Sequence, residues 1–202
     1  MVRISKTITA MIIVLSVVSC NQEKKVENPL LVEFSTPFQT PPFDKIKHEH
    51  YVPAIDSAIA EAKGEIDRII NNSEAPTFEN TIAALDASGR RLSMVSNILF
   101  NLNGAETDSV LQRIVREVSP KLTDFSNDVS LNPQLFERIK IVWSKRDSIS
   151  LTAEQKTLLE SSYKGFVRSG ANLNDEDKEK FRAISKELAD LSLQFSENLL
   201  AE

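Results

Sequence analysis

The sequence predicts an all-α protein that folds from residue 44 onward as an antiparallel helical bundle. Apolar residues recur there at spacings of three and four, and no stretch alternates apolar and polar residues as a half-buried strand would. Only five glycines and eight prolines occur in a chain of 202 residues. The remainder is rich in Ala, Leu, Glu and Lys, which favour helices. A hydrophobic content of 41% is enough for a sizeable core.

The N-terminus has the layout of a lipoprotein signal peptide, which we assign to residues 1–19. A basic segment (3–6) precedes an apolar stretch (11–18) that is too short to span a membrane. The letters VVSC, which end at Cys20, resemble a bacterial lipobox. We therefore expect Cys20 to carry a lipid on its thiol and to anchor the protein to a membrane of the cell envelope, facing the periplasm. A plain signal peptide with an incidental cysteine is the alternative.

Residues 20–43 are polar and then rich in proline, and we expect a tether that ends in an extended arm. The first helix of the domain over 44–202 is expected to carry Pro53 in its first turn and to end at Asn71. A second helix is expected to follow the N-cap Thr77 and to continue to a turn at Asn103-Gly104. The small Gly89 on its apolar face predicts that a neighbouring helix passes close by.

A third helix is expected to begin near Asp108. Pro120 interrupts it, but the apolar face stays in phase on both sides, so a kink is expected rather than a break. Asn132-Pro133 then begins a shorter helix. Large side chains on these helices are expected in the core rather than in a ligand site: Met94, Phe100, Trp143 and Phe166.

The last two helices are bounded by clear signals. A capping box at 152–155 begins one, and Gly170 is a natural stop for it. The final helix begins at Asn174, and nothing in the sequence signals its end before Glu202, so the chain is expected to be truncated. Its apolar stripe is expected to pack on a part absent from this sequence: Phe181, Ile184, Leu188, Leu191, Phe195 and Leu199.

Residues able to perform hydrolytic chemistry are scarce. The only histidines are His48 and His50, and a zinc helix of the H-E-x-x-H type would need its second histidine where Val52 stands. We expect the pair to form a polar entry to the first helix, with metal binding as the alternative. The acidic run 175–177 suits a helix N-terminus better than a metal cluster. A net charge of -5 without a basic patch argues against nucleic-acid binding.

Several stretches together resemble the N-terminal region of the zinc metallopeptidases that include peptidyl-dipeptidase Dcp, oligopeptidase A and thimet oligopeptidase. Their order and spacing carry the resemblance, and FVRSGANL brings the peptidyl-dipeptidase branch closest. The matching stretches are PPFDKIKHEHYVPAI (41–55), APTFENTIAALDASGRRLSMV (75–95), LNPQLFERIK (131–140), LTAEQKTLLESSYKGFVRSGANL (151–173) and ISKELADLSLQFSENLLAE (184–202).

The resemblance implies the N-terminal part of a larger, two-lobed helical peptidase, in which this region forms one wall of a channel for short peptides. In such enzymes the opposite wall carries zinc, held by two histidines and a glutamate, and a second glutamate helps the metal to activate water. None of these residues has a counterpart here. We therefore assign no catalytic, cofactor-binding or metal residue, and expect a monomer that is inactive alone. The alternative is a non-catalytic helical lipoprotein that serves as a peptide-binding or interaction module.

Overall fold

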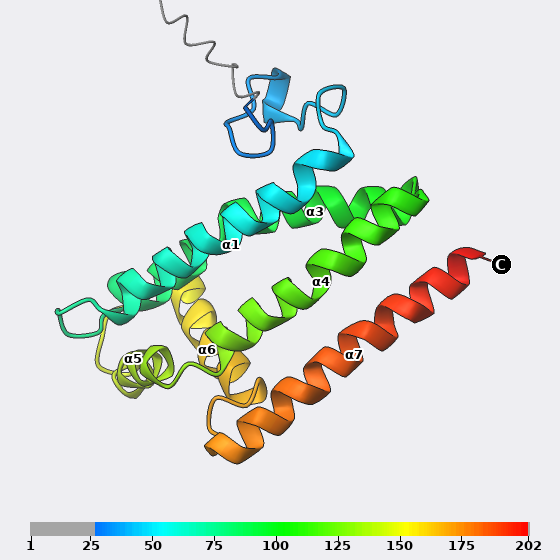
Figure 1. Cartoon of the computed structure of the whole chain (residues 1–202). Coiled ribbons are helices and arrows are strands. Elements are labelled where there is room, and N and C mark those ends of the chain that lie inside the picture. Colours follow the sequence, from blue (N-terminus) through cyan, green and yellow to red (C-terminus); the bar gives the residue numbers. More distant parts are fainter. Residues whose placement is uncertain (1–26, 202) are drawn as a thin grey trace, which may run out of the picture.

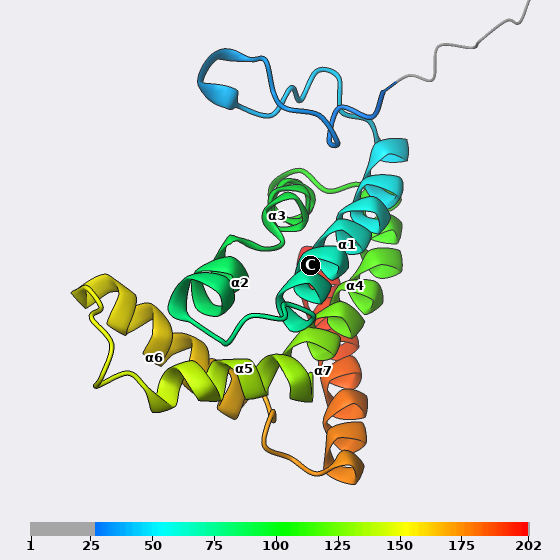
Figure 2. The same ribbon diagram turned by 90° about the vertical axis from the view of Figure 1, so that its left-hand side faces the viewer.

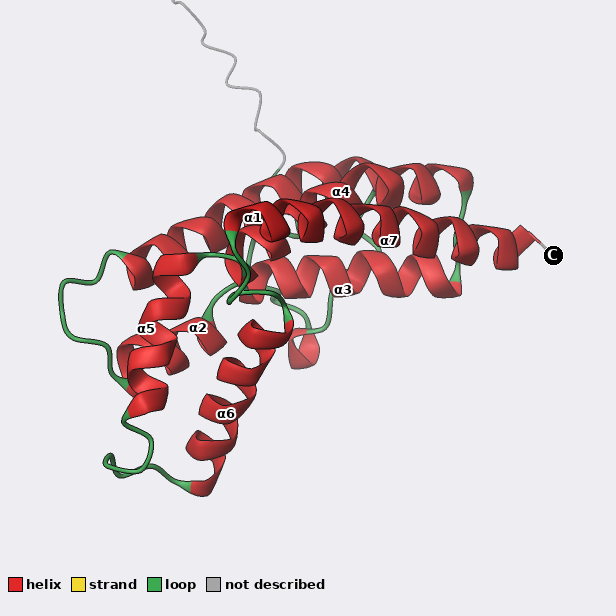
Figure 3. Cartoon of the chain, turned by 90° about the horizontal axis from the view of Figure 1, so that it is seen from below, coloured by secondary structure: helices red, strands yellow, loops and turns green. Residues whose placement is uncertain are grey.

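The structure, a computed structural model, describes residues 27–201, and in this range it contains helices and loops but no strand (Figure 3). The predicted signal peptide and Cys20 lie outside the described residues. The all-α prediction is confirmed. The α-helices are α1 (His48–Ile70), α2 (Ala84–Ala87), α3 (Arg90–Ala105), α4 (Ser109–Ser130), α5 (Pro133–Ser144), α6 (Ala153–Arg168) and α7 (Asp175–Ala201), with a 3-10 turn η1 (Pro37–Gln39) and a π-helix η2 (Phe78–Ala83).

Helices α1, α3 and α4 form a bundle in which α3 runs antiparallel to the other two, and α7 returns along α4 (Figure 1). Their apolar faces meet in a first core. Its fully buried side chains include Ile55, Val95, Leu99, Val115 and Val118. The bundle is therefore held by the faces that the sequence periodicity predicts.

A second core lies at the far end of α1, where η2, α5 and α6 pack together (Figure 2). Ile82, Leu135, Ile139 and Leu159 are its most deeply buried side chains. Trp143 stacks on Tyr163 with ring centroids 4.7 Å apart, which adds an aromatic contact between α5 and α6. The two cores place α6 beside the bundle rather than in it.

The Pro-rich arm packs on the bundle from Asn28 onward. Leu30 is fully buried in the first core, a burial worth about 2 kcal/mol for a leucine. The Asn28 side chain donates a hydrogen bond to the His50 carbonyl (2.8 Å), and Arg91 donates to the Leu31 carbonyl (2.8 Å). Residues 28–31 of the arm are thus fixed to α1 and α3.

Helix α1 begins five residues before the predicted start, so Pro53 lies inside the helix rather than in its first turn. The cap explains the difference: the Lys47 backbone N–H donates to His50 Nδ1 at 3.0 Å. Pro53 removes only the hydrogen bond to the Glu49 carbonyl, near the helix end, where the loss is small.

The predicted long helix from Thr77 is broken in two, which corrects the sequence expectation. Gly89 adopts φ +67°, a left-handed conformation, between α2 and α3. Its backbone N–H donates to Glu65 Oε2 on α1 at 2.7 Å, so the break is fastened to the neighbouring helix. The predicted turn at Asn103-Gly104 is also wrong, because α3 continues through both residues to Ala105. Asn103 nevertheless bonds the Thr107 hydroxyl that follows the helix (3.0 Å).

Other predicted helix ends are confirmed. Thr77, Asp108, Asn132 and Thr152 each cap the helix that follows them through a side-chain oxygen. Helix α4 continues through Pro120 without a break. Gly170 adopts φ +85° just after α6, as expected of a helix stop.

Candidate functional site

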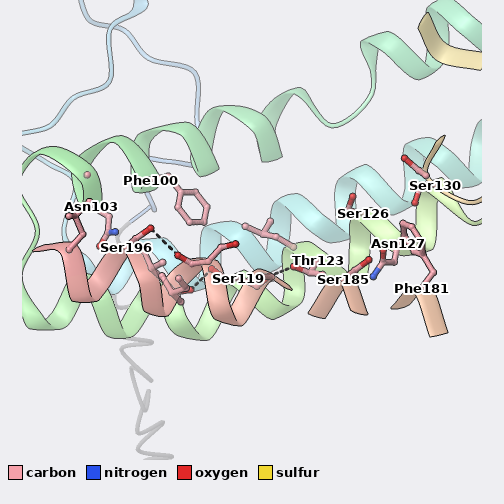
Figure 4. A pocket seen from close by; sticks show the side chains of 18 residues that line it. Phe100, Asn103, Ser119, Thr123, Ser126, Asn127, Ser130, Phe181, Ser185 and Ser196 are labelled. Carbon is pink, nitrogen blue, oxygen red and sulfur yellow. Dashed lines mark hydrogen bonds between the residues drawn. The ribbon is translucent and has the colours of Figure 1, made fainter. Parts of the chain in front are cut away.

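Two adjoining hollows make a continuous concave surface, which we call the trough. The first, of about 830 Å³, lies between α3, α4 and α7, and Figure 4 shows the residues that line it. The second, of about 610 Å³, lies between α3, α4 and α6. They share a common boundary on α4 and just after α6: Leu122, Ser126, Ser130 and Ser169.

Small side chains at helical spacing leave the trough open. Helix α4 contributes Ser119, Thr123, Ser126 and Ser130, and α7 contributes Ser185, Ala189, Ser192 and Ser196. Both series are spaced four, three and four residues apart, so each follows one face of its helix. Because these side chains are short, two facing helices cannot fill the space between them.

Three hydroxyls of the trough donate their protons to a carbonyl of the helix that carries them. Ser119 donates to the Val115 carbonyl (2.8 Å) and Thr123 to the Ser119 carbonyl (3.0 Å). Ser196 on α7 likewise donates to the Ser192 carbonyl (3.0 Å). Each hydroxyl proton is satisfied within its own helix, and the oxygen lone pairs remain free to accept a hydrogen bond.

Two buried polar atoms beside the trough have no hydrogen-bond partner among the described residues. Asn127, which is 4% exposed, has an unpaired Nδ2 at the first hollow, and Ser96 has an unpaired Oγ at the second. Figure 4 shows Asn127 between Ser130 and Ser185. A buried polar atom without a partner costs about 1–3 kcal/mol, so a group that bonded it would be stabilised.

The two histidines lie at the beginning of the bundle, where each contacts a neighbouring polar group. His48 Nε2 lies 3.2 Å from Asp108 Oδ2, while His50 Nδ1 accepts from the Lys47 backbone. Among residues 27–201 no three His, Cys, Asp or Glu side chains are grouped so that they could hold a metal ion. The donor set present here does not fit a zinc site.

Asp108 connects His48 to the start of α4. Its carboxylate accepts the backbone N–H groups of Leu111 and Val110, each at 2.8 Å. The hydrogen bond from Leu111, helped by that from Val110 and by the charges of His48 and Arg113, lowers the pKa of Asp108. This carboxylate is therefore a charged helix cap at neutral pH.

The acidic run at 175–177 is likewise a helix cap. Asn174 Oδ1 accepts the Asp177 backbone N–H at 2.9 Å, and Lys180 pairs with Glu176 (2.7 Å) and Asp177 (3.2 Å). These carboxylates thus stand in the first turn of α7, as the sequence indicates.

Phe100 was expected in the core but is 39% exposed and lines the first hollow. Met94, Trp143 and Phe166 are partly buried against the two cores, in keeping with the prediction. Phe100 departs because it lies on the side of α3 that faces the first hollow, whereas the neighbouring Leu99 is fully buried in the first core.

Arg138 is a structural residue that the sequence reasoning did not single out. It is only 8% exposed, and its guanidinium donates to the Asn72 carbonyl (2.9 Å), the Glu74 carbonyl (3.4 Å) and Asn80 Oδ1 (3.2 Å). A signal was present, because Arg138 lies at helical spacing between the buried Leu135 and Val142. An arginine on an apolar face indicates buried carbonyl partners.

No helix among the described residues combines the length and apolarity that crossing a bilayer requires. The predicted lipid attachment at Cys20 lies outside this region and remains an expectation from the sequence.

Comparison with known proteins agrees with the resemblance found in the sequence. The family model described as "Neurolysin/Thimet oligopeptidase, N-terminal domain" matches residues 55–178. The dipeptidyl carboxypeptidases of Salmonella typhimurium and Escherichia coli are 41% and 39% identical over 174 residues, which is 86% of this chain and 26% of each relative. Oligopeptidase A of Escherichia coli is 29% identical over 177 residues, 86% of this chain and 25% of the relative.

The chain thus spans about a quarter of the length of these relatives. The match of the family model covers more than half of the chain, from the middle of α1 to the start of α7. The chain belongs to the neurolysin/thimet oligopeptidase N-terminal domain family.

Proposed function

We propose that this chain is the N-terminal, channel-wall portion of a lipid-anchored zinc metallopeptidase that hydrolyses short peptides in the manner of a peptidyl-dipeptidase. The observation that carries the proposal is the similarity to dipeptidyl carboxypeptidases over 86% of the chain. The all-α bundle and the trough support it, because a channel wall needs a concave surface on a rigid scaffold.

The trough is suited to an extended peptide backbone. Its floor is apolar at Leu122 and Leu193, and hydroxyl oxygens stand along both sides. A peptide in extended conformation has free N–H groups that could donate to these oxygens, and a free carbonyl that could accept from Asn127 if that side chain turned toward it. Such contacts involve the backbone, so they would hold peptides of many sequences.

Zinc and the general base belong, in this proposal, to residues outside this chain. Zinc, when bound there, would supply an activated water and polarise the scissile carbonyl. The present residues contribute peptide binding and exclusion of bulk water along one wall. No protein group in the described region is placed to move a proton for hydrolysis.

Expression of the complete coding region tests the peptidase proposal. The product should cleave a quenched fluorescent peptide and lose that activity with a metal chelator, and added zinc should restore it. The alternative, a non-catalytic module, would be supported if the complete product binds the peptide without cleaving it. A coding region that ends at residue 202 would also contradict the peptidase proposal.

The lipid anchor, and with it the periplasm-facing location at the bacterial envelope, is proposed from the layout that ends at Cys20. Cells that express the wild-type chain should incorporate a clickable fatty acid into it. The Cys20→Ala variant should take up none. Absence of label in the wild type would contradict the anchor and leave the peptidase proposal untouched.

A further inference from the structure

Helix α7 turns its large apolar side chains away from the domain. Five of them form a single row, which we call the outer stripe: Ile184, Leu188, Leu191, Phe195 and Leu199. Each of these residues is between 54% and 69% exposed. The opposite arrangement, with large side chains inward, is usual for a helix on the surface of a soluble domain. The outer stripe is therefore a helix face without a partner in the described structure.

The side of α7 that faces α4 is attached to it mainly through ion pairs. Lys186 pairs with Asp124 at 2.9 Å and Arg182 with Asp128 at 3.0 Å. Glu197 pairs with Arg116 at 2.6 Å near the other end of the helix. These pairs are partly exposed, and such pairs hold elements only weakly. The pairs lie on the side of α7 that faces α4, and the outer stripe lies on the exposed side.

The outer stripe also borders the trough. Leu199 belongs to the stripe and to the lining of the first hollow, so a partner that covered the stripe would stand at the edge of the trough. The spacing of four, three, four and four residues makes a straight seam that suits one helix packed along α7. The match to this chain covers only 26% of each of these relatives, so most of each relative has no counterpart here.

We infer that the outer stripe is the contact face for a helix of the catalytic part of the full-length peptidase. This inference rests on the proposed function and names the surface through which the channel wall meets that part. The partner helix covers Leu188, Leu191 and Phe195, and its position at the edge of the first hollow closes one side of the peptide channel. A second copy of the chain, packed through the same face, is the competing occupant.

A hybrid enzyme tests the inference. In the dipeptidyl carboxypeptidase of Escherichia coli, the segment that matches this chain is replaced by the corresponding residues of this chain, and activity shows that the hybrid folds. Leu188→Glu/Phe195→Glu should then lower the melting temperature of the hybrid by about 5 °C or more, because each glutamate would be buried without a partner. The same pair should leave the melting temperature of the 202-residue chain within about 1 °C, since both positions are exposed there.

Phe38→Glu is the matched control, because Phe38 is fully exposed on the N-terminal arm. This substitution should change the melting temperature of neither protein. An active hybrid that tolerates Leu188→Glu/Phe195→Glu would overturn the inference alone. An inactive hybrid, beside an active Escherichia coli enzyme, would overturn the proposed function and the inference with it. A 202-residue chain that is dimeric by light scattering, and monomeric as the double variant, would assign the stripe to a second copy instead.

Discussion

Arg138 shows how a charged side chain can belong to the core of this domain. Its guanidinium lies at the inner end of the loop between α1 and η2, and two backbone carbonyls of that loop accept from it. Its Nε is buried without a partner, so the site is not fully satisfied. Without Arg138 these loop carbonyls would lose their side-chain donor, so this residue joins α5 to the loop.

Arg138→Ala should therefore lower the free energy of unfolding by about 3 kcal/mol, the cost of removing a buried charged hydrogen-bonding group. Urea unfolding followed by far-UV circular dichroism measures the change. Arg90→Ala, at an exposed position on α3, is the matched control and should stay within about 0.5 kcal/mol of the wild type. A loss for Arg138→Ala as small as that for Arg90→Ala would show that water replaces the guanidinium.

Residues at helix ends were the most predictable. Asp108, Asn132 and Thr152 were recognisable because a capping side chain acts on backbone groups within three residues of it. The partners of Arg138 were not, because they lie 58 to 66 residues away along the chain. Asn127 stands at a helical position where a polar side chain would ordinarily face solvent, so only the packing of α7 reveals it as buried. Ser96 was more predictable, because it lies at helical spacing between the apolar Leu92 and Leu99.

Elements were predicted correctly in kind, and their boundaries failed where tertiary contacts overrode local signals. Gly89 was expected to allow a close approach between helices, and a Cβ placed there would indeed lie 4.0 Å from Ala62. The same glycine instead breaks the helix, because Glu65 on α1 accepts its backbone N–H. The trough could not be predicted, because a row of serines at helical spacing is equally typical of a solvent-exposed helix face.

Helix α7 has no fully buried side chain among its described residues. Its amide protons should exchange with solvent faster than those of α1 and α4, because it lacks a buried apolar face of its own. Arg182→Gln/Lys186→Gln should raise the exchange rates of α7 about threefold to thirtyfold, given up to about 1 kcal/mol for each exposed ion pair. Hydrogen exchange measured by mass spectrometry gives the rates for each helix.

Lys164→Gln removes an ion pair with Glu160 within α6 and is the matched control, which should leave the exchange of α7 unchanged. High salt should act in the same direction as the double substitution, because it screens exposed charges. If α7 exchanges as slowly as α4 in the wild type, its attachment is stronger than these ion pairs can explain.

At the scale of the whole molecule, the described part of the chain has two cores and a trough, and in it no three His, Cys, Asp or Glu side chains are grouped to hold a metal ion. The family could be predicted from the sequence because matching stretches recur in order from residue 41 to the C-terminus. The outward direction of the α7 stripe follows the sequence expectation for five of its six residues, whereas Phe181 lines the first hollow. The chain thus matches the dipeptidyl carboxypeptidases over about a quarter of their length. This leads to a prediction about the activity of the chain alone.

The 202-residue chain should hydrolyse no short peptide above background, with or without added zinc. A catalytic zinc needs three protein ligands and an open position, and a general base within reach of the bound water. His48 is paired with Asp108 and His50 accepts from Lys47, so neither is available without loss of a contact that holds the start of α1 or α4. Isothermal titration should accordingly show zinc binding no tighter than in His48→Ala/His50→Ala. If the wild-type chain cleaves a quenched fluorescent peptide in a chelator-sensitive way, and the double variant does not, the two histidines are ligands after all.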